Sequence, residues 1–205
     1  MGYPRLFLAI PVSGDIRAYF LRLRKELQSR FEKTPINWTA SENLHLTLHY
    51  FGNVSIEEYA RIEPRVDRVL CTCPRFDLTF DKAALFPSVN RPRIIACEIE
   101  TNKTLENLVA DLRKELTPAV RLPQARPFRG HVTLGRFKGL PATTQTGENG
   151  LSRCQRMAVA LEPFPAKTGP VMNVGEVALF NSTTRADGPV YEVVKHWRLR
   201  ESANR

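Results

Sequence analysis

The sequence lacks any hydrophobic run that approaches the length of a membrane span, and it contains few cysteines. The four cysteines are Cys71, Cys73, Cys97 and Cys154, and they form no C-x-x-C pair. These absences exclude a helical membrane protein, a disulfide-stapled domain and a cysteine-based zinc module. We therefore expect a cytoplasmic protein whose thiols are free, with no membrane partner.

Acidic residues are also scarce relative to basic ones. The 205 residues include 30 Lys and Arg against 21 Asp and Glu, which gives a net charge of +9 and a pI near 9.7. Such a balance fits a solvated basic surface or an anionic partner, such as RNA, another nucleic acid or a nucleotide phosphate. Apolar residues make up 42% of the chain, enough for one domain or for two small lobes around a shared core.

Histidine occurs only four times, yet two copies stand in the same four-residue pattern: His45-Leu46-Thr47-Leu48 and His131-Val132-Thr133-Leu134. In a β-strand, residues i and i+2 point to the same face, so each copy predicts an imidazole and a hydroxyl side by side. Two facing strands would supply a base, an acid and donors for anionic oxygens, which suits displacement at phosphorus. The alternative is a pair of histidines that are hydrogen-bonded inside a core.

The two motifs close two similar halves. In each half a buried strand, an amphipathic helix and the strand with the motif follow one another. These segments are 6–12, 15–31 and 43–51 in the first half, and 93–99, 105–116 and 129–137 in the second. The order predicts an internal duplication that brings the two motif strands together across a pseudo-twofold axis.

Further elements complete an α+β prediction. Ser55 and Glu58 form a capping box for another helix. We also expect a strand at 76–80, a surface loop at 139–150, a short helix at 151–161, an irregular segment at 163–170 and a hairpin of 174–181 with 189–199 that turns near 186–188. The predicted fold is a single domain over 1–205. It is bilobal and pseudo-twofold, with two antiparallel sheets lining a central cleft and helices packed outside. The lobes span roughly 1–90 and 91–200, and the place of the C-terminal hairpin stays open.

Segments around both motifs carry a resemblance to a known family. They are Arg5–Pro11, Glu42–Leu48, Phe51-Gly52, Arg126–Phe128, His131–Leu134 with Arg136, and Gly188–Val193. With these flanks the chain resembles the 2H phosphoesterase superfamily over most of its length. It is most similar to the bacterial and archaeal RNA 2′,3′-cyclic phosphodiesterases, also called 2′-5′ RNA ligases.

The resemblance implies a monomeric enzyme that uses no metal or cofactor. It would hydrolyse RNA or nucleotide 2′,3′-cyclic phosphates to 2′-phosphate ends, and the reverse reaction would join RNA ends through a 2′-5′ linkage without ATP. By resemblance, His45 is the proton donor and His131 the proton acceptor, and Thr47, Thr133 and Arg136 bind the substrate. Sequence symmetry alone does not assign the two histidines to these roles, although an unperturbed pKa near 6.5 suits both.

Four further positions bear on the predicted site. Arg136 lies five residues after His131, so strict alternation places it on the opposite face unless the strand bulges or ends near Gly135. His49 is expected to share the face of His45 and to extend the polar groove or pack at its rim. Leu8 stands where many relatives have an aromatic that stacks on a base, so base recognition is expected to come from elsewhere or to be weak. His196 is expected to be structural.

Three other functions stay open. The chain could be a nucleotide- or RNA-binding module of the same fold without catalysis. It could be a phosphodiesterase for another cyclic or 2′-5′ linked nucleotide. It could also be a basic RNA-binding protein with no phosphoesterase role.

Overall fold

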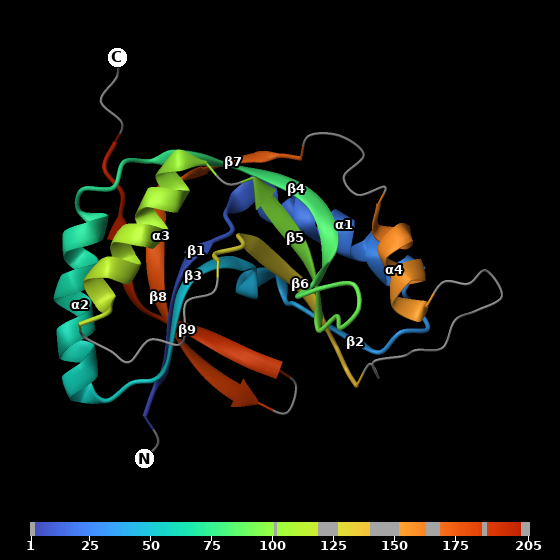
Figure 1. The fold of residues 1–205 in the computed structure, drawn as a ribbon, viewed down its shortest axis with the longest axis horizontal. Coiled ribbons are helices and arrows are strands. Elements are labelled where there is room, and N and C mark those ends of the chain that lie inside the picture. Colours follow the sequence, from blue (N-terminus) through green and yellow to red (C-terminus); the bar gives the residue numbers. More distant parts are fainter. Residues whose placement is uncertain are drawn as a thin grey trace.

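The structure is a computed structural model that describes residues 3–100, 102–118, 127–139, 152–162, 169–185 and 188–201 (Figure 1). In chain order the elements are β1 (Arg5–Pro11), α1 (Gly14–Arg30), β2 (Ile36–Trp38), the short 3-10 helix η1 (Ser41–Asn43), β3 (His45–Asn53), α2 (Ile56–Leu70), β4 (Phe76–Phe86), β5 (Ile94–Glu100), α3 (Lys103–Leu116), β6 (His131–Phe137), α4 (Arg153–Leu161), β7 (Val171–Val174), β8 (Glu176–Arg185) and β9 (Gly188–Arg198).

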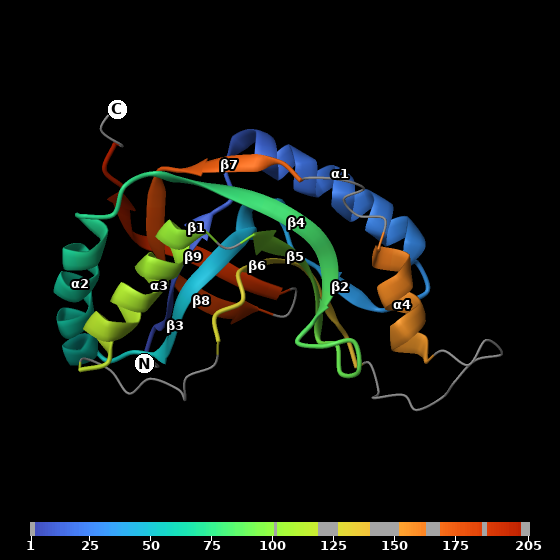
Figure 2. The same ribbon diagram turned by 45° about the horizontal axis from the view of Figure 1, so that its top comes forward.

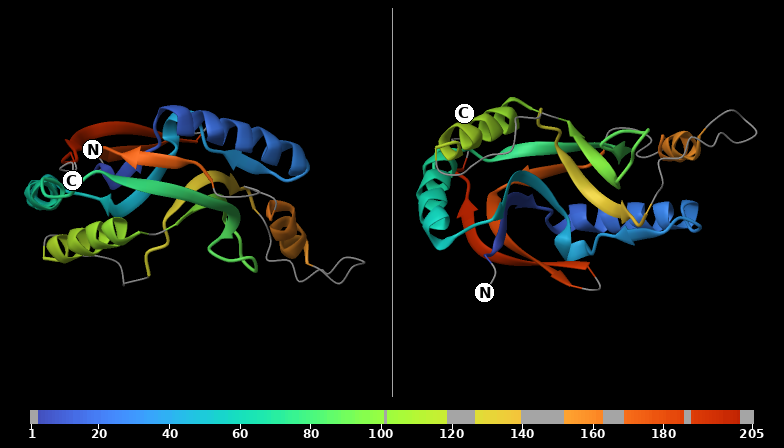
Figure 3. Two further views of the ribbon diagram at one scale, coloured as in Figure 1. Left: turned by 90° about the horizontal axis from the view of Figure 1, so that it is seen from above. Right: turned by 60° about the horizontal axis from the view of Figure 1, so that its bottom comes forward.

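The described strands form one curled antiparallel sheet in the order β7-β4-β5-β6-β3-β1-β8-β9, and β2 pairs with β6. The order is symmetric about its centre, because β6 and β3 each neighbour the first strand of their own half. Figure 2 shows β7 beside β4 along one edge, and Figure 3 shows how the sheet curls. The predicted hairpin is present as β8 and β9.

The two sides of this sheet meet at a single residue pair, Leu46 on β3 with Val132 on β6. The α+β fold with two antiparallel halves is thus confirmed, and the halves join into one sheet at its middle. The sheet does not divide near residue 90, because β4 pairs with β5 of the second half. The C-terminal hairpin, in turn, pairs with β1 of the first half. The division of the domain into two lobes near residue 90 stays a prediction.

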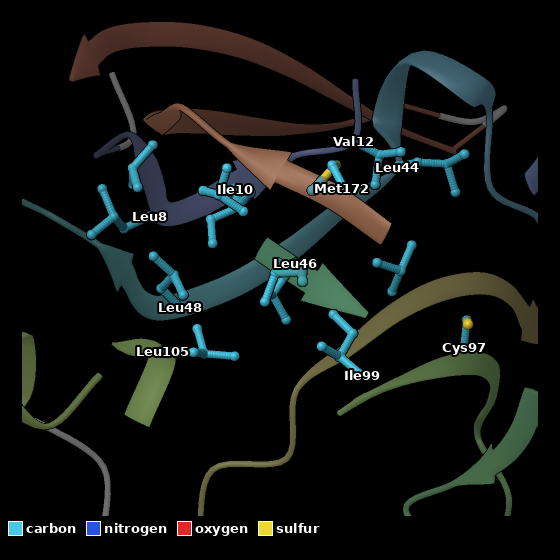
Figure 4. Close-up of a cluster of buried hydrophobic side chains, with 14 of the residues drawn as sticks. Leu8, Ile10, Val12, Leu44, Leu46, Leu48, Cys97, Ile99, Leu105 and Met172 are labelled. Carbon is cyan, nitrogen blue, oxygen red and sulfur yellow. The ribbon is translucent and has the colours of Figure 1, made fainter. Parts of the chain in front are cut away.

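The helices cover one face of the sheet. The apolar stripes of α1 and α3 are buried, and the ring of Phe20 on α1 lies edge-on to that of Phe80 on β4 at 5.0 Å. The main core joins these helix residues to every second residue of the central strands, including Leu8 and Leu46 (Figure 4). Two smaller clusters on the strands contain no helix residue. We call the sheet face that carries these two clusters the open face.

Most of the expected elements are present with boundaries shifted by a few residues. The capping box is confirmed, since the Ser55 hydroxyl accepts from the Glu58 amide at 3.2 Å while the Glu58 carboxylate accepts from the Ser55 amide. The short strands β2 and β7 were not predicted, and β4 continues six residues past the expected strand. Most of the expected loop at 139–150, of the segment 163–170 and of the turn at 186–188 lies outside the described residues.

Two further expectations concern cysteines and membranes. All four cysteines are free, as predicted. Among the described residues, no helix combines the length and the apolar character that crossing a bilayer requires.

Candidate active site

The two His-x-Thr motifs lie side by side at the centre of the sheet. Because Leu46 pairs with Val132 in an antiparallel ladder, His45 lies across from Thr133, and Thr47 lies across from His131. Leu46 and Val132 point into the main core, so the four polar side chains between them point to the open face. Diagonal neighbours in such a ladder are roughly 7–8 Å apart, which leaves room for one phosphate between the two imidazoles.

Each imidazole is fixed through the same ring nitrogen. His45 Nδ1 lies 2.7 Å from the Asn43 carbonyl oxygen, and His131 Nδ1 lies 2.8 Å from the Arg129 carbonyl oxygen. A carbonyl only accepts, so each Nδ1 carries the hydrogen and each neutral ring has its lone pair on Nε2. Neither Nε2 has a hydrogen-bond partner among the described residues. Both rings are therefore oriented to exchange a proton at Nε2.

Burial sets the charge of both histidines. It lowers the pKa of His45, with a smaller lowering from His131, and the hydrogen bond to Asn43 opposes the shift. Burial also lowers the pKa of His131, and the Arg129 cation and the Glu98 carboxylate act on it in opposite directions. The electrostatic influence of His131 on His45 agrees with their closeness across the strand pair. A phosphate anion between them would raise both pKa values, because an opposite charge favours the imidazolium.

An aromatic ring flanks each histidine. The Phe7 ring lies 4.9 Å from His45, tilted by 37°, and the Phe86 ring lies 4.5 Å from His131, tilted by 33°. Each ring belongs to one of the two small clusters of the open face. The strand register places these two clusters at equivalent positions in the two halves. The clusters are Phe7, Ala9, Ala178 and Phe180 with Tyr191 in the first half, and Phe86, Ile94 and Ala96 with Ala84 in the second. These rings bury the imidazole edges and hold them in place.

A β-bulge brings Arg136 to the open face. Thr133 pairs with Ala96, but Gly135 pairs with Ile95, so Leu134 is an extra residue on β6. Arg136 then pairs with Ile94, a member of the open-face cluster. The bulge near Gly135 that the sequence analysis required is thus present. Arg136 makes no hydrogen bond or ion pair with any described residue.

The matching bulge on β3 corrects the prediction for His49. Thr47 pairs with Ala9, but His49 pairs with Leu8, so Leu48 is the extra residue. Leu8 lies in the main core, and His49 therefore turns away from the face of His45. Its ring packs 4.6 Å from that of Phe51, and burial lowers its pKa to about 4. His49 is no part of the polar groove.

The expectation about Leu8 also needs correction. Leu8 is fully buried on the helix-covered side of β1, as Figure 4 shows, so no residue at this position could stack on a base at the open face. Its neighbour Phe7 faces the site instead. The absence of an aromatic at position 8 therefore says nothing about base binding.

A cavity of about 240 Å³ adjoins His45 on the side of β8 and β9. Tyr191 lines it and lies edge-on to His45 at 5.3 Å, and the charged residues that line it are Glu42, Glu176 and Arg17. His196 also lines it, with a half-exposed side chain whose Nδ1 lies 3.6 Å from Glu176. His196, which was expected to be structural, thus faces the same space as His45.

Charged residues lie beside His131 on the side of β5. Glu98 is the register partner of His131 on β5, and its carboxylate is paired with the Arg129 guanidinium. That guanidinium lies 4.1 Å from the centre of the Phe86 ring, so it also fixes the ring that contacts His131. The two histidines therefore share a backbone environment but differ in the charges around them.

Comparison with known proteins decides the family. The LigT like Phosphoesterase family model matches residues 10–96. The RNA 2′,3′-cyclic phosphodiesterase of Escherichia coli is 30% identical over 131 residues, which are 63% of this chain and 70% of that protein. The chain belongs to the LigT-like phosphoesterase family. An RNA 2′,3′-cyclic phosphodiesterase of Methanothermobacter thermautotrophicus is 28% identical over 195 residues, which cover 95% of this chain and 98% of that protein.

Solved structures show that the LigT-like fold extends over the whole chain. The crystal structure of TT0787 from Thermus thermophilus matches with a TM-score of 0.76 at 24% identity, over 97% of this chain and all of that one. Escherichia coli LigT complexed with 3′-AMP matches with a TM-score of 0.71 at 24% identity, over 96% of this chain and 98% of that one.

The structure places on the open face all five residues that the sequence predicts for the site: His45, Thr47, His131, Thr133 and Arg136. It adds residues that no local pattern indicated, namely Phe7, Phe86, Arg129, Tyr191 and the two cavity carboxylates. Tyr191 reaches His45 only because the last strand folds back beside β8.

Proposed function

We propose that this protein hydrolyses 2′,3′-cyclic phosphates of RNA or nucleotides to 2′-phosphate ends without a metal ion. The observation that carries the proposal is a pair of imidazoles, each held through Nδ1. Their Nε2 atoms, which have no partner among the described residues, share the open face where β3 pairs with β6. The names of the relatives support the substrate class. A 5′-hydroxyl that attacks phosphorus in place of water, with the 3′-oxygen as the leaving group, would form a 2′-5′ linkage without ATP, because the cyclic ester is already activated.

In the proposed reaction, water attacks phosphorus while His131 Nε2 takes a proton from it. The bond between phosphorus and the 3′-oxygen breaks, and His45 Nε2 donates its proton to that oxygen. The products are a 2′-phosphate and a 3′-hydroxyl, and exchange with solvent restores both rings. Each proton transfer contributes a factor on the order of 10² to 10⁴. We assign the donor and acceptor roles by resemblance to the family.

The remaining residues stabilise the charge on the phosphate. Among the described residues, the hydroxyls of Thr47 and Thr133 have no hydrogen-bond partner, so both are available to donate to the nonbridging oxygens. Arg136 would supply a positive charge from the other end of β6. The phosphate in turn would raise the pKa of His45, which a proton donor requires.

The test is product analysis with a 2′,3′-cyclic nucleotide and with an RNA that ends in a cyclic phosphate, in the presence of EDTA. We expect 2′-phosphate products and a loss of at least about 10²-fold in His45→Ala and His131→Ala. The pH–rate curve of the wild type should be a bell. A flat profile between about pH 5 and 9, or full activity in either variant, would contradict the two-histidine mechanism.

A binding module of the same fold is the second candidate, favoured by the basic surface. It would bind the cyclic nucleotide without opening the ring. The same incubation distinguishes the two, because only an enzyme converts the substrate.

A further inference from the structure

Arg5 is a positive charge on the open face that the proposed reaction does not use. It opens β1, two residues before Phe7, whose ring contacts His45. Residues i and i+2 of a strand share a face, so Arg5 follows Phe7 along the open face. Its backbone amide donates to Asn181 Oδ1 at 3.1 Å, which fixes the start of the strand.

Tyr50 holds the Arg5 side chain. Arg5 Nε donates to Tyr50 Oη, and the guanidinium carbon lies 5.4 Å from the centre of the Tyr50 ring. The two terminal nitrogens of Arg5 have no partner among the described residues. A guanidinium fixed at Nε presents these two donors as a fork that matches phosphate oxygens.

The symmetry of the sheet gives this pair a counterpart. Tyr50 pairs with Phe7 after the bulge on β3, just as Arg136 pairs with Ile94 after the bulge on β6. The first half thus has a tyrosine where the second half has an arginine, and Arg5 restores the guanidinium from the neighbouring strand.

Both cations act electrostatically on Tyr191 beside His45. Tyr191, which contacts His45, has its pKa raised by burial, and the charges of Arg136 and Arg5 both oppose that rise. The cavity on the other flank of His45 is lined by two carboxylates and one guanidinium, those of Glu42, Glu176 and Arg17, and therefore carries no excess of positive charge. An RNA chain that leaves the site therefore meets a favourable charge at Arg5, whereas the cavity offers no excess of positive charge.

We propose that Arg5, held by Tyr50, binds the phosphodiester that precedes the terminal nucleotide of an RNA strand. The inference rests on the proposed function for the position of the cyclic phosphate between His45 and His131. Hydrolysis needs no second strand, so the bound phosphate belongs to the strand that carries the cyclic end. The enzyme would then favour RNA ends over mononucleotides.

The experiment compares adenosine 2′,3′-cyclic phosphate with the dinucleotide ApA that ends in a 2′,3′-cyclic phosphate. The two substrates share the reacting group and differ by one phosphodiester and one nucleoside. We expect the ratio of kcat/KM, dinucleotide over mononucleotide, to fall about 5-fold in Arg5→Ala, the effect of one exposed charge contact. Tyr50→Phe, which keeps the cation but removes its acceptor, should give a smaller fall.

Arg65→Ala is the matched control, because Arg65 is a partly exposed cation on α2 whose guanidinium, in the described part of the chain, bonds only within its own helix. It should leave the ratio at the wild-type value. In Arg5→Ala, the log–log salt slope for dinucleotide binding should decrease by about 0.7. A wild-type ratio in Arg5→Ala, or an equal fall in Arg65→Ala, would overturn the proposal.

A wild type that opens neither substrate would refute the proposed function but not end the test of Arg5. Dissociation constants for 2′-AMP and for ApA with a 2′-phosphate can be measured without turnover. Their ratio should change about 5-fold in Arg5→Ala and stay constant in Arg65→Ala. Equal ratios in wild type and Arg5→Ala would overturn the inference independently of catalysis.

Discussion

Acidification should destabilise this protein through His49. The Nε2 of His49 is buried and has no hydrogen-bond partner in the described part of the chain. Burial, with a smaller effect of the Arg113 cation, lowers its pKa from 6.5 to about 4. The unfolded chain therefore takes up a proton near pH 6.5, whereas the folded protein resists it until about pH 4.

The sign and size of the effect follow from this difference. The stability that depends on neutral His49 is fully present above pH 6.5 and is lost as the pH falls through the folded pKa. A difference of about 2.5 pKa units at 1.36 kcal/mol each gives a limit of about 3 kcal/mol, and about 2 kcal/mol is already lost at pH 5. His45 and His131 act in the same direction, because burial lowers both of their pKa values.

Urea denaturation at pH 7 and pH 5 measures the effect. The comparison of wild type with His49→Leu isolates His49, since the other histidines are common to both. The wild type should lose about 2 kcal/mol more free energy of unfolding than the variant between the two pH values. His49→Gln, which is polar but does not titrate, should behave like His49→Leu in this difference. Equal losses in wild type and both variants would refute the reasoning.

Three further outcomes are expected. Thr133→Val should lower kcat/KM about 10- to 100-fold while Thr133→Ser retains most activity, and equal activities would exclude a role for the hydroxyl. Gly135→Ala should cost about 1–3 kcal/mol of stability, because an added Cβ would lie 2.6 Å from Ile36 Cγ2. Removal of that methyl in Ile36→Ala should recover part of the cost in a double-mutant cycle, and additivity would contradict the contact. Glu98→Gln should move the His131 limb of the pH–rate curve to lower pH, since the carboxylate raises the pKa of that ring; an unmoved limb would deny the coupling.

The strands and helices around the two motifs could be predicted because their apolar periodicity is strong. The Leu46 and Val132 positions had to be buried, and that fixed the faces of the histidines and threonines. The capping box at Ser55 depends on local residues only, so it was predictable as well.

The alternation of side chains along a strand does not predict the correct face of the sheet beyond a β-bulge. An extra residue at Leu48 reverses the face of the residues that follow it up to the next bulge, which misplaced His49, and the extra Leu134 has the same effect on Arg136. A bulge depends on how two strands pair, and the sequence of one strand does not contain that information. The position of Tyr191 beside His45 is likewise a property of the sheet order, since β9 reaches the site only through β8.

The most direct test of the central claim is a nitrogen-detected NMR titration of the histidine rings with 2′-AMP. Spectra of His45→Ala and His131→Ala assign the signals. We predict that both rings carry hydrogen on Nδ1 in the free protein and that both Nε2 resonances shift together as the phosphate binds. A response from only one of the two rings, or the opposite tautomer in either, would contradict a site in which both imidazoles share one phosphate.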